Sequence, residues 1–427
     1  MSKSQSAKSA SPAATNRFER HPRLTLSVIL LGSLGMALLG AEVIARWAYP
    51  LDTGTSWEYR IPHPRFGWVL APGASYVYRL AEDSVPVSYN AEGWRDLPHA
   101  KDKAEGVVRV LVLGDSFMEA FSVRFEDSLP ARLEHLISPA GRRVEVINFG
   151  VGGYSTLQEY LVFSAVGRAY QPDVVVLAMF LRNDLRENSQ ELASLIETNL
   201  KAQARPFLDP QVNEPGWRVT QPDFEGALQR FEEHRRWWAN RLLRQSALLR
   251  LGQQALERLS RHLASASPDR EYLANFGQNY CSQPLEYKRS WGVTRRILTR
   301  LNSEVSAAGA RLLVMAVPAI EEIDEDVMAR VVRDAPQADR LCLEEAPAYW
   351  QLGKLLRELD IDYLDLLPAF RDARRQTGVE LFRRSDDHWN PQGHALAARE
   401  LAAALERRGY LVWHGADFAS DGKVDAR

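Results

Sequence analysis

The chain has 427 residues, which is too long for one small domain and long enough to bury a sizeable hydrophobic core. Its net charge is only −2, so the composition excludes a protein that binds nucleic acid through a strongly basic surface. The two cysteines, Cys281 and Cys342, are too few for a disulfide framework or a cysteine metal site. They can form one pair in an oxidising compartment, but the sequence does not show whether they meet.

The amino terminus combines a basic tail with a long apolar segment. Residues 1–23 are polar and contain several lysines and arginines, which predicts a disordered cytoplasmic tail. Residues 24–41 carry no charge and reach the lower limit for a helix that crosses a bilayer. Because the basic residues precede this segment, residues 24–48 are predicted to be a single-pass anchor in the inner membrane, with the rest of the chain in the periplasm. A cleaved signal peptide is the alternative, but the segment is long for one and no clear cleavage site follows it.

Residues 50–105 are rich in proline and aromatic residues and form a predicted extracytoplasmic extension. Short strands are expected over 75–80 and 85–89, and residues 90–96 have turn composition. Within this turn, we expect Trp94 and Arg95 to pack on the main domain rather than line its pocket.

Between residues 106 and 410, apolar segments alternate with helical ones. Strands are predicted at 107–113, 144–149, 174–180, 311–317 and 361–366, and helices at 127–138, 156–164, 294–305 and 391–408. Asn390 and Pro391 are a typical start for the last helix, and Gly409 suits its end. The expected fold class is α/β: a three-layer α/β/α domain with a parallel, flavodoxin-like doubly wound sheet. Residues 411–427 are expected to form a tail.

A long insertion, about 185–290, interrupts this alternation and has mostly helical character. We expect it to form a helical cap over the strand ends, with an apolar stripe made of Trp238, Leu242, Leu249, Leu256 and Leu259. The arginines between residues 230 and 261 fit a solvated helix face better than a surface for anionic polysaccharide or lipid.

Polar residues follow the predicted strands at the ends where open α/β sheets place their ligands. Ser116 follows the first strand in Gly114-Asp115-Ser116, Gly153 the second and Asn183 the third, while His388 precedes the last helix. Acyl transfer by a serine needs a nucleophile, a base, a group that orients the base and oxyanion donors. Each motif alone is ordinary turn or cap chemistry, but their coincidence at successive strand ends favours a catalytic site.

With these residues the sequence resembles the GDSL-type, or SGNH, esterase and lipase superfamily, which is named for Ser, Gly, Asn and His in four ordered blocks. The resemblance covers roughly residues 105–184 and 290–410, and residues 90–96 are similar to anchored bacterial members. It implies that Ser116 attacks, that His388 is the base, and that the Ser116 N–H, the Gly153 N–H and the Asn183 amide form the oxyanion hole. Gly150 is the less favoured oxyanion glycine.

The sequence departs from the family pattern in two places. Leu181 replaces the glycine that usually stands two residues before the asparagine, which puts the pocket shape in doubt. Ser385 replaces the aspartate found three residues before the histidine in many members, so we assign the orienting role to Asp386, with Asp387 as the fallback. His394 is expected to pack or lie at the surface.

These observations predict a membrane-anchored serine esterase that hydrolyses O-acyl esters, such as acetyl esters, on envelope carbohydrate or lipid. An O-acyltransferase that modifies an envelope polysaccharide is one alternative, and a non-catalytic glycan-binding or assembly protein is another. No cofactor or metal is expected: residues 150–153 lack the spacing of a dinucleotide fingerprint, and Asp386, Asp387 and His388 lack further metal ligands.

Overall fold

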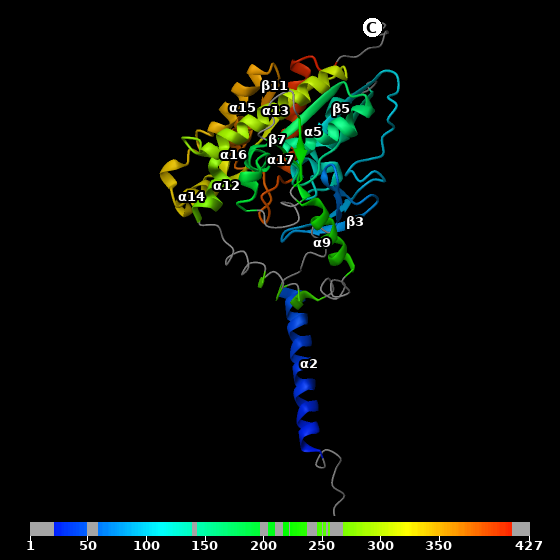
Figure 1. The fold of residues 1–427 in the computed structure, drawn as a ribbon, viewed down its shortest axis with the longest axis vertical. Coiled ribbons are helices and arrows are strands. Elements are labelled where there is room, and N and C mark those ends of the chain that lie inside the picture. Colours follow the sequence, from blue (N-terminus) through cyan, green and yellow to red (C-terminus); the bar gives the residue numbers. More distant parts are fainter. Residues whose placement is uncertain are drawn as a thin grey trace, which may run out of the picture. The chain divides into compact units, whose positions relative to one another are not determined.

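The computed structural model describes residues 21–48, 59–138, 143–196, 204–209, 217–221, 223–236, 246–249, 251–252, 255–256 and 268–411 (Figure 1). The chain divides into two compact units. One comprises Met1–Leu51 and Trp238–Arg261, and the other comprises Asp52–Trp237 and His262–Arg427. All predicted site residues belong to the second unit.

The first unit contains helix α2 (Pro22–Ala48), which by length and composition is able to cross a membrane. Near the end of α2, the Glu42 carboxylate accepts hydrogen bonds from the backbone N–H groups of Ala247 (2.9 Å) and Leu248 (3.0 Å). Part of the predicted insertion therefore packs on α2. In the predicted apolar stripe, Leu249 and Leu256 are exposed, while Trp238, Leu242 and Leu259 lie outside the described residues. A cap formed by this segment stays a prediction.

A five-stranded parallel sheet forms the centre of the second unit. Its order is β11-β10-β7-β5-β6, and the strands are β5 (Val107–Leu113), β6 (Arg143–Asn148), β7 (Val174–Phe180), β10 (Arg311–Val317) and β11 (Asp362–Asp365). The chain adds β6 on one side of β5 and then crosses back to add the other strands, which is the flavodoxin-like order predicted. All residues of β5 and β7 are buried, as central strands with helices on both faces require.

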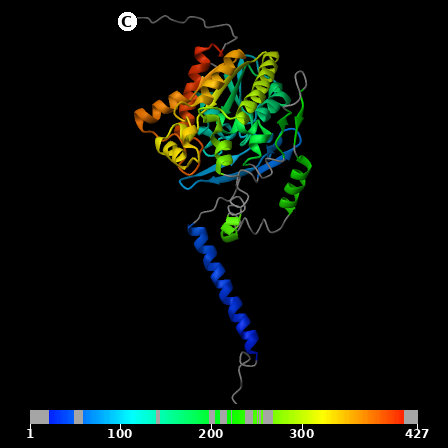
Figure 2. The same cartoon turned by 60° about the vertical axis from the view of Figure 1, so that its left-hand side comes forward.

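Helices flank this sheet as right-handed crossovers demand (Figure 2). Helix α4 (Leu129–Ile137) packs on α17 (Pro391–Arg407), and α5 (Thr156–Ala165) packs on α13 (Leu285–Ala307). The Asn390 side chain caps α17 by accepting hydrogen bonds from the N–H groups of Gln392 and Gly393, as the sequence predicted. Helix α13 begins well before the predicted residue 294, so the sheet domain extends into the predicted insertion.

The remaining elements are shorter or were not predicted. They are α3 (Ser116–Glu119), α6 (Leu181–Glu187), α7 (Gln190–Ala193), α9 (Phe224–Arg236), α12 (Pro268–Phe276), α14 (Glu325–Asp334), α15 (Pro347–Glu358), α16 (Leu367–Thr377), β8 (Phe207–Leu208) and β9 (Val219–Thr220), with 3-10 turns at Phe125–Asp127, Gly167–Tyr170, Gly277–Asn279, Ile320–Glu322 and Ala338–Arg340.

The described part of the extension forms two antiparallel hairpins. Strand β1 (Arg60–His63) pairs with β2 (Gly67–Leu70), and β3 (Ser75–Arg79) pairs with β4 (Ser84–Ser88). Trp94 is buried and its ring meets that of Phe149 edge-on at 4.6 Å. The Arg95 guanidinium is buried and donates to the carbonyl groups of Glu119, Ala120 and Val123. The expectation that both residues pack rather than line the pocket agrees with these contacts.

Cys281 and Cys342, which are 61 positions apart in the sequence, form a disulfide. Beside it, Tyr280 and Leu341 form an isolated antiparallel β-bridge. The disulfide therefore joins the segment that precedes α13 to the segment that precedes α15.

Candidate active site

One pocket at the carboxyl ends of the strands contains every predicted site residue. Its volume is about 500 Å³, and it is lined by Ser116, Gly153, Asn183, Asp386 and His388 together with Arg60, Phe117, Phe121, Gly152, Phe180, Arg182, Arg186, Glu187, Ser385 and Asp387. These residues come from five separate parts of the chain. The sheet order explains why these segments lie together. Strands β5 and β7 are neighbours, and the chain adds β6 on one side of β5 before it crosses back to add β7 on the other side.

Ser116 is the first residue of α3, immediately after the buried strand β5. Asp115 caps this short helix by accepting a hydrogen bond from the Phe117 N–H at 2.9 Å. Its second carboxylate oxygen accepts a hydrogen bond from the Asn183 side-chain amide at 2.8 Å. Burial raises the pKa of Asp115 above its usual value, although these two donors oppose the effect. Asp115 thus links the serine turn to the asparagine, a role that the sequence analysis did not assign.

The glycine segment after β6 offers one backbone donor to the pocket. The Gly150 N–H is bound by the Asn148 side chain (2.9 Å), and the Gly152 N–H by the Glu119 carboxylate (2.6 Å). Among the described residues, no hydrogen-bond acceptor pairs with the Gly153 N–H, and Gly153 has a φ of +76°, which glycine adopts without strain. The geometry therefore favours Gly153 over Gly150 as an oxyanion donor.

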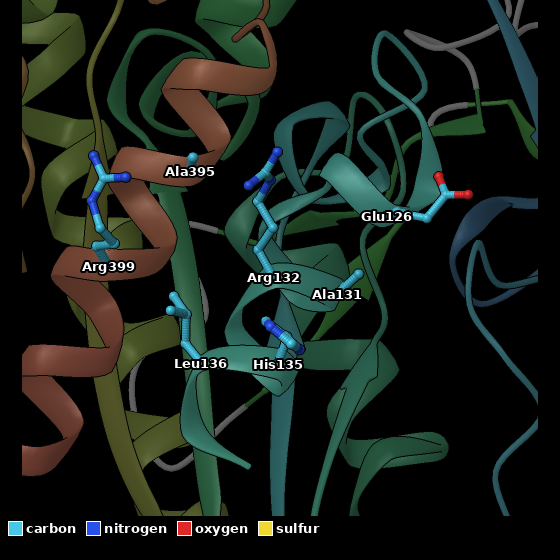
Figure 3. A pocket seen from close by; sticks show the side chains of 7 residues that line it. All are labelled: Glu126, Ala131, Arg132, His135, Leu136, Ala395 and Arg399. Carbon is cyan, nitrogen blue, oxygen red and sulfur yellow. The ribbon is translucent and has the colours of Figure 1, made fainter. Parts of the chain in front are cut away.

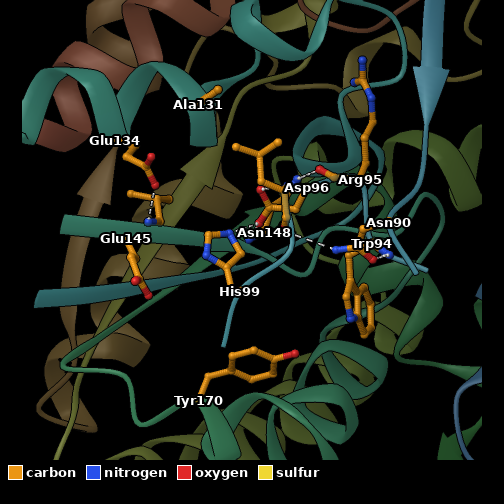
Figure 4. Close-up of polar contacts among 12 residues, drawn as sticks. Asn90, Trp94, Arg95, Asp96, His99, Ala131, Glu134, Glu145, Asn148 and Tyr170 are labelled. Carbon is orange, nitrogen blue, oxygen red and sulfur yellow. Dashed lines mark hydrogen bonds and ion pairs between the residues drawn. The ribbon is translucent and has the colours of Figure 1, made fainter. Parts of the chain in front are cut away.

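The segment of residues 90–96 fixes the start of this glycine turn (Figure 4). The Asp96 carboxylate accepts a hydrogen bond from the Asn148 backbone N–H at 2.7 Å, and His99 lies 3.3 Å from the same oxygen. The Asn148 side chain in turn donates to the Met118 carbonyl at 2.8 Å. The end of β6 is thereby tied both to the extension and to helix α3, next to the serine.

Asn183 lies in the first turn of α6, directly after β7. The Asp184 carboxylate accepts a hydrogen bond from the Phe180 N–H at 2.7 Å, which fixes the start of the helix. Leu181 is buried in this turn, and Asn183 nevertheless lines the pocket. The side-chain amide has two hydrogens, of which Asp115 takes one.

Asp386 is the partner of His388. The distance between Asp386 Oδ1 and His388 Nδ1 is 2.5 Å. Burial lowers the pKa of His388, but the hydrogen bond and the negative charge of Asp386 outweigh it, so that the pKa lies above its usual value. Asp387, the fallback of the sequence analysis, instead forms an ion pair with Arg182 at 3.0 Å. Among the described residues no hydrogen bond joins Ser116 Oγ to His388 Nε2, although such bonds often tighten only when substrate binds.

The arginines that line the pocket have acidic partners. Arg60 forms a buried ion pair with Glu119 (3.0 Å), Arg182 contacts Glu321 (3.1 Å) as well as Asp387, and Arg186 contacts its neighbour Glu187 (3.0 Å). Sequence reasoning missed these pairs because the partners are distant or inside an unassigned segment. Besides neutralising the charge of Arg60, the Glu119 carboxylate accepts hydrogen bonds from the Gly152 N–H and from the Tyr89 hydroxyl, the latter at 2.8 Å.

A second cavity of about 240 Å³ lies between α4 and α17 (Figure 3). It is lined by Glu126, Ala131, Arg132, His135, Leu136, Ala395 and Arg399. It holds none of the predicted site residues. His394, which follows the start of α17, is buried and its Nδ1 accepts a hydrogen bond from the Leu129 N–H at 3.2 Å, which is a packing role as expected. Within the described parts of the chain, no cluster of histidine, cysteine and acidic residues is suited to hold a metal ion.

Comparisons with solved structures give distant matches. The chain is similar to a crystal structure of an acetyl xylan esterase, AlAXEase, with 15% identity and a TM-score of 0.37, over 70% of this chain and 100% of that chain. It is also similar to the esterase EstA from a Pseudoalteromonas species, with 11% identity, a TM-score of 0.33 and coverage of 70% and 97%. A two-domain esterase active on acetylated mannans matches with 11% identity, a TM-score of 0.34 and coverage of 70% and 49%.

A search of curated proteins found no match to this chain. Residues 281–423, however, match a family model described as the SGNH hydrolase-like domain of the acetyltransferase AlgX. The match includes Asp386 and His388 but not Ser116, Gly153 or Asn183, which lie earlier in the chain. Residues 281–423 therefore match an SGNH hydrolase-like model, in agreement with the resemblance that the sequence motifs predicted.

Proposed function

We propose that this protein is a membrane-anchored serine esterase that cleaves O-acyl esters through an acyl-enzyme. The observation that carries the proposal is the Asp386–His388 pair, which lines the same pocket as Ser116 and Gly153. A nucleophile, an oriented base and oxyanion donors at one cavity are what acyl transfer by serine requires.

In the proposed reaction, His388 Nε2 takes the proton of Ser116 Oγ as this oxygen attacks the ester carbonyl. Asp386 fixes the imidazole tautomer at Nδ1 and stabilises the imidazolium that forms. The N–H groups of Ser116 and Gly153 and the free hydrogen of the Asn183 amide stabilise the oxyanion. His388 then donates its proton to the leaving alcohol, and water, activated by the same base, hydrolyses the acyl-enzyme to release the acid.

The proposed substrate is an acyl ester on carbohydrate or lipid of the cell envelope. Two features support a site outside the cytoplasm. Helix α2 is suited to cross a membrane, and the basic residues before it favour an amino terminus in the cytoplasm. The Cys281–Cys342 disulfide is a bond that persists in oxidising compartments such as the periplasm.

An O-acyltransferase is the second candidate, and one observation favours it. The matched family is described as an acetyltransferase domain. The same residues would form the same acyl-enzyme, and a sugar hydroxyl would replace water in the second step. A non-catalytic glycan-binding protein is the third candidate, but a binding site has no need for the Asp386–His388 pair beside Ser116.

The test compares the full chain in detergent with Ser116→Ala and with Ser194→Ala, a control whose hydroxyl donates to the Glu191 carbonyl outside the pocket. The assay measures acid release from short-chain aryl esters and acetylated xylan, and labelling by a serine-directed phosphonate. Activity lost only in Ser116→Ala supports the esterase. Labelling of Ser116 without acid release supports the transferase, whose acceptor is then sought among envelope glycans. If the wild type shows no labelling and no acid release, both catalytic proposals are refuted.

A further inference from the structure

The segment that carries His388, residues 383–388, is held by a hairpin from the opposite end of the chain. The turn between β3 and β4, residues 80–83, makes contacts along this segment. The Glu82 carboxylate accepts hydrogen bonds from the Ser385 hydroxyl (2.5 Å) and from the Arg384 N–H (3.1 Å). Asp83 forms an ion pair with Arg383 at 3.2 Å. The histidine segment therefore rests on the extension as well as on the sheet domain.

Tyr78, the fourth residue of β3, reaches the orienting carboxylate itself. Its hydroxyl donates a hydrogen bond to Asp386 Oδ2 at 3.0 Å, while Asp386 Oδ1 is bound to His388 Nδ1. The two oxygens of one carboxylate thus have separate partners. The Tyr78 ring also meets Phe121 edge-on at 4.9 Å, and Phe121 packs edge-on against the His388 ring at 5.0 Å.

We propose that Tyr78 is a positioning residue of the catalytic site, and that the β3–β4 hairpin is an integral part of that site. The inference rests on the proposed function, because it concerns the same acyl transfer. Nothing in the SGNH motifs assigns a role to this hairpin, and the matched region, residues 281–423, does not include it.

The physical reason is that a carboxylate bound through one oxygen can still rotate about its bond to Cβ. A hydrogen bond at Oδ2 removes this freedom and so fixes the direction of Oδ1 toward the imidazole. It also draws negative charge toward Oδ2, which moderates the attraction between Asp386 and the imidazolium. Tyr78 therefore affects both the geometry of His388 and its affinity for a proton.

Loss of the Tyr78 hydroxyl changes these two properties in predictable directions. The orientation of Asp386 is less restricted, so kcat falls. The charge on Oδ1 increases, so the imidazolium is stabilised and the acidic limb of the kcat/KM profile moves to higher pH. Other titratable groups near His388 are Asp115, after β5, Asp387, whose charge is shared with Arg182 of α6, and the buried His394 of α17.

The experiment measures pH profiles of aryl-ester hydrolysis for the full chain and for Tyr78→Phe, with Tyr160→Phe as the matched control. The Tyr160 hydroxyl donates to Glu304 at 2.8 Å on α13, outside the pocket. For Tyr78→Phe we expect kcat to fall about tenfold, as for the loss of a hydrogen bond to a charged group. KM should change little, and the acidic limb should move upward by a few tenths of a unit. Glu82→Gln, which weakens the contacts with Ser385 and Arg384, should lower kcat in the same direction with less effect on the pH profile.

A Tyr78→Phe profile that matches both the wild type and Tyr160→Phe overturns the inference. The inference is also refuted if activity falls only in step with a lower melting temperature and the acidic limb does not shift. That result would give the Tyr78 hydroxyl a merely structural role. Failure of the proposed function is distinguishable, because in that case the wild type itself neither releases acid nor is labelled at Ser116, or Ser116→Ala keeps the wild-type activity. If Ser116→Ala is inactive and Tyr78→Phe is normal, only the present inference fails.

Discussion

Replacing Asp386 with asparagine removes the negative charge beside His388 and keeps the size of the side chain. In the structure Asp386 Oδ1 lies 2.5 Å from His388 Nδ1, and both side chains are mostly buried, with exposed fractions of 13% and 21%. At an effective dielectric constant of about 20, opposite unit charges roughly 4 Å apart attract by about 4 kcal/mol. This attraction acts in full only when His388 is an imidazolium, which is how the transition state differs from the ground state.

A loss of about 4 kcal/mol of transition-state stabilisation corresponds to a decrease in kcat of roughly a thousandfold. The asparagine amide also favours the wrong imidazole tautomer, which adds to the decrease. The pH profile gives an independent check. Asp386 raises the pKa of His388, and activity requires the neutral imidazole, so the acidic limb of the wild type should lie above pH 6.5. In Asp386→Asn the pKa of His388 falls, and the limb should move to lower pH.

Asp387→Asn is the matched comparison, because its carboxylate is adjacent in sequence but pairs with Arg182. We expect it to lower kcat by less than about tenfold, as for an ion pair that is largely exposed. The assay is aryl-ester hydrolysis by the full chain across pH 5–9, with circular dichroism as a check on folding. Equal losses in both variants, or a larger loss in Asp387→Asn, would refute the assignment of Asp386 as the orienting group.

Three further predictions follow from the structure. Asn183→Ala should lower kcat by about 10²–10³ with a smaller change in KM, the usual effect of losing an oxyanion donor; an unchanged kcat would exclude Asn183 from the oxyanion hole. Reduction, or Cys281→Ser, should lower the free energy of unfolding by up to about 4 kcal/mol in a denaturant titration, since the disulfide closes a loop of 61 residues; an unchanged midpoint would contradict this. Burial raises the pKa of Glu322 from 4.5 to about 7, so the folded protein holds a proton that the unfolded chain releases in this window. The free energy of unfolding should therefore decrease by up to about 3 kcal/mol as the pH rises from 4.5 to 7, and Glu322→Gln should abolish this decrease; an unaltered pH dependence would contradict the assignment.

Much of the fold was predictable because the signals are local. The strands at 107–113, 174–180 and 311–317 have the predicted bounds, since a continuous apolar run between turn residues is decided by nearby side chains. The cap of α17 at Asn390 is likewise a local interaction. Helices α14, α15 and α16 were not predicted from the sequence: α15 packs on β11 and α16 on α17, whereas α14 contacts the turns at Ile320–Glu322 and Ala338–Arg340.

The candidate site divides in the same way. Sequence order and strand ends predicted Ser116 and Asn183 at one edge of the sheet, because parallel strands bring their carboxyl ends together, and the structure places both in one pocket with His388. The sequence favoured Asp386 over Asp387 for the orienting role, and the structure shows the contact itself, because Asp386 lies on the imidazole and Asp387 pairs with Arg182. The sequence already favoured Gly153 over Gly150, and the structure adds that the Gly150 N–H is bound by the Asn148 side chain.

By itself, the sequence determined the class of the fold, the apolar segment at residues 24–41 and the residue types available at the strand ends. These follow from periodicity, turn composition and charge over windows of a few residues. The tertiary structure alone decided the contacts between distant segments: the Cys281–Cys342 bond, the Arg60–Glu119 pair and the hydrogen bond between Tyr78 and Asp386, which are 308 positions apart. No local pattern encodes such contacts, because they depend on how the extension, the sheet and the loop before α17 pack together in three dimensions.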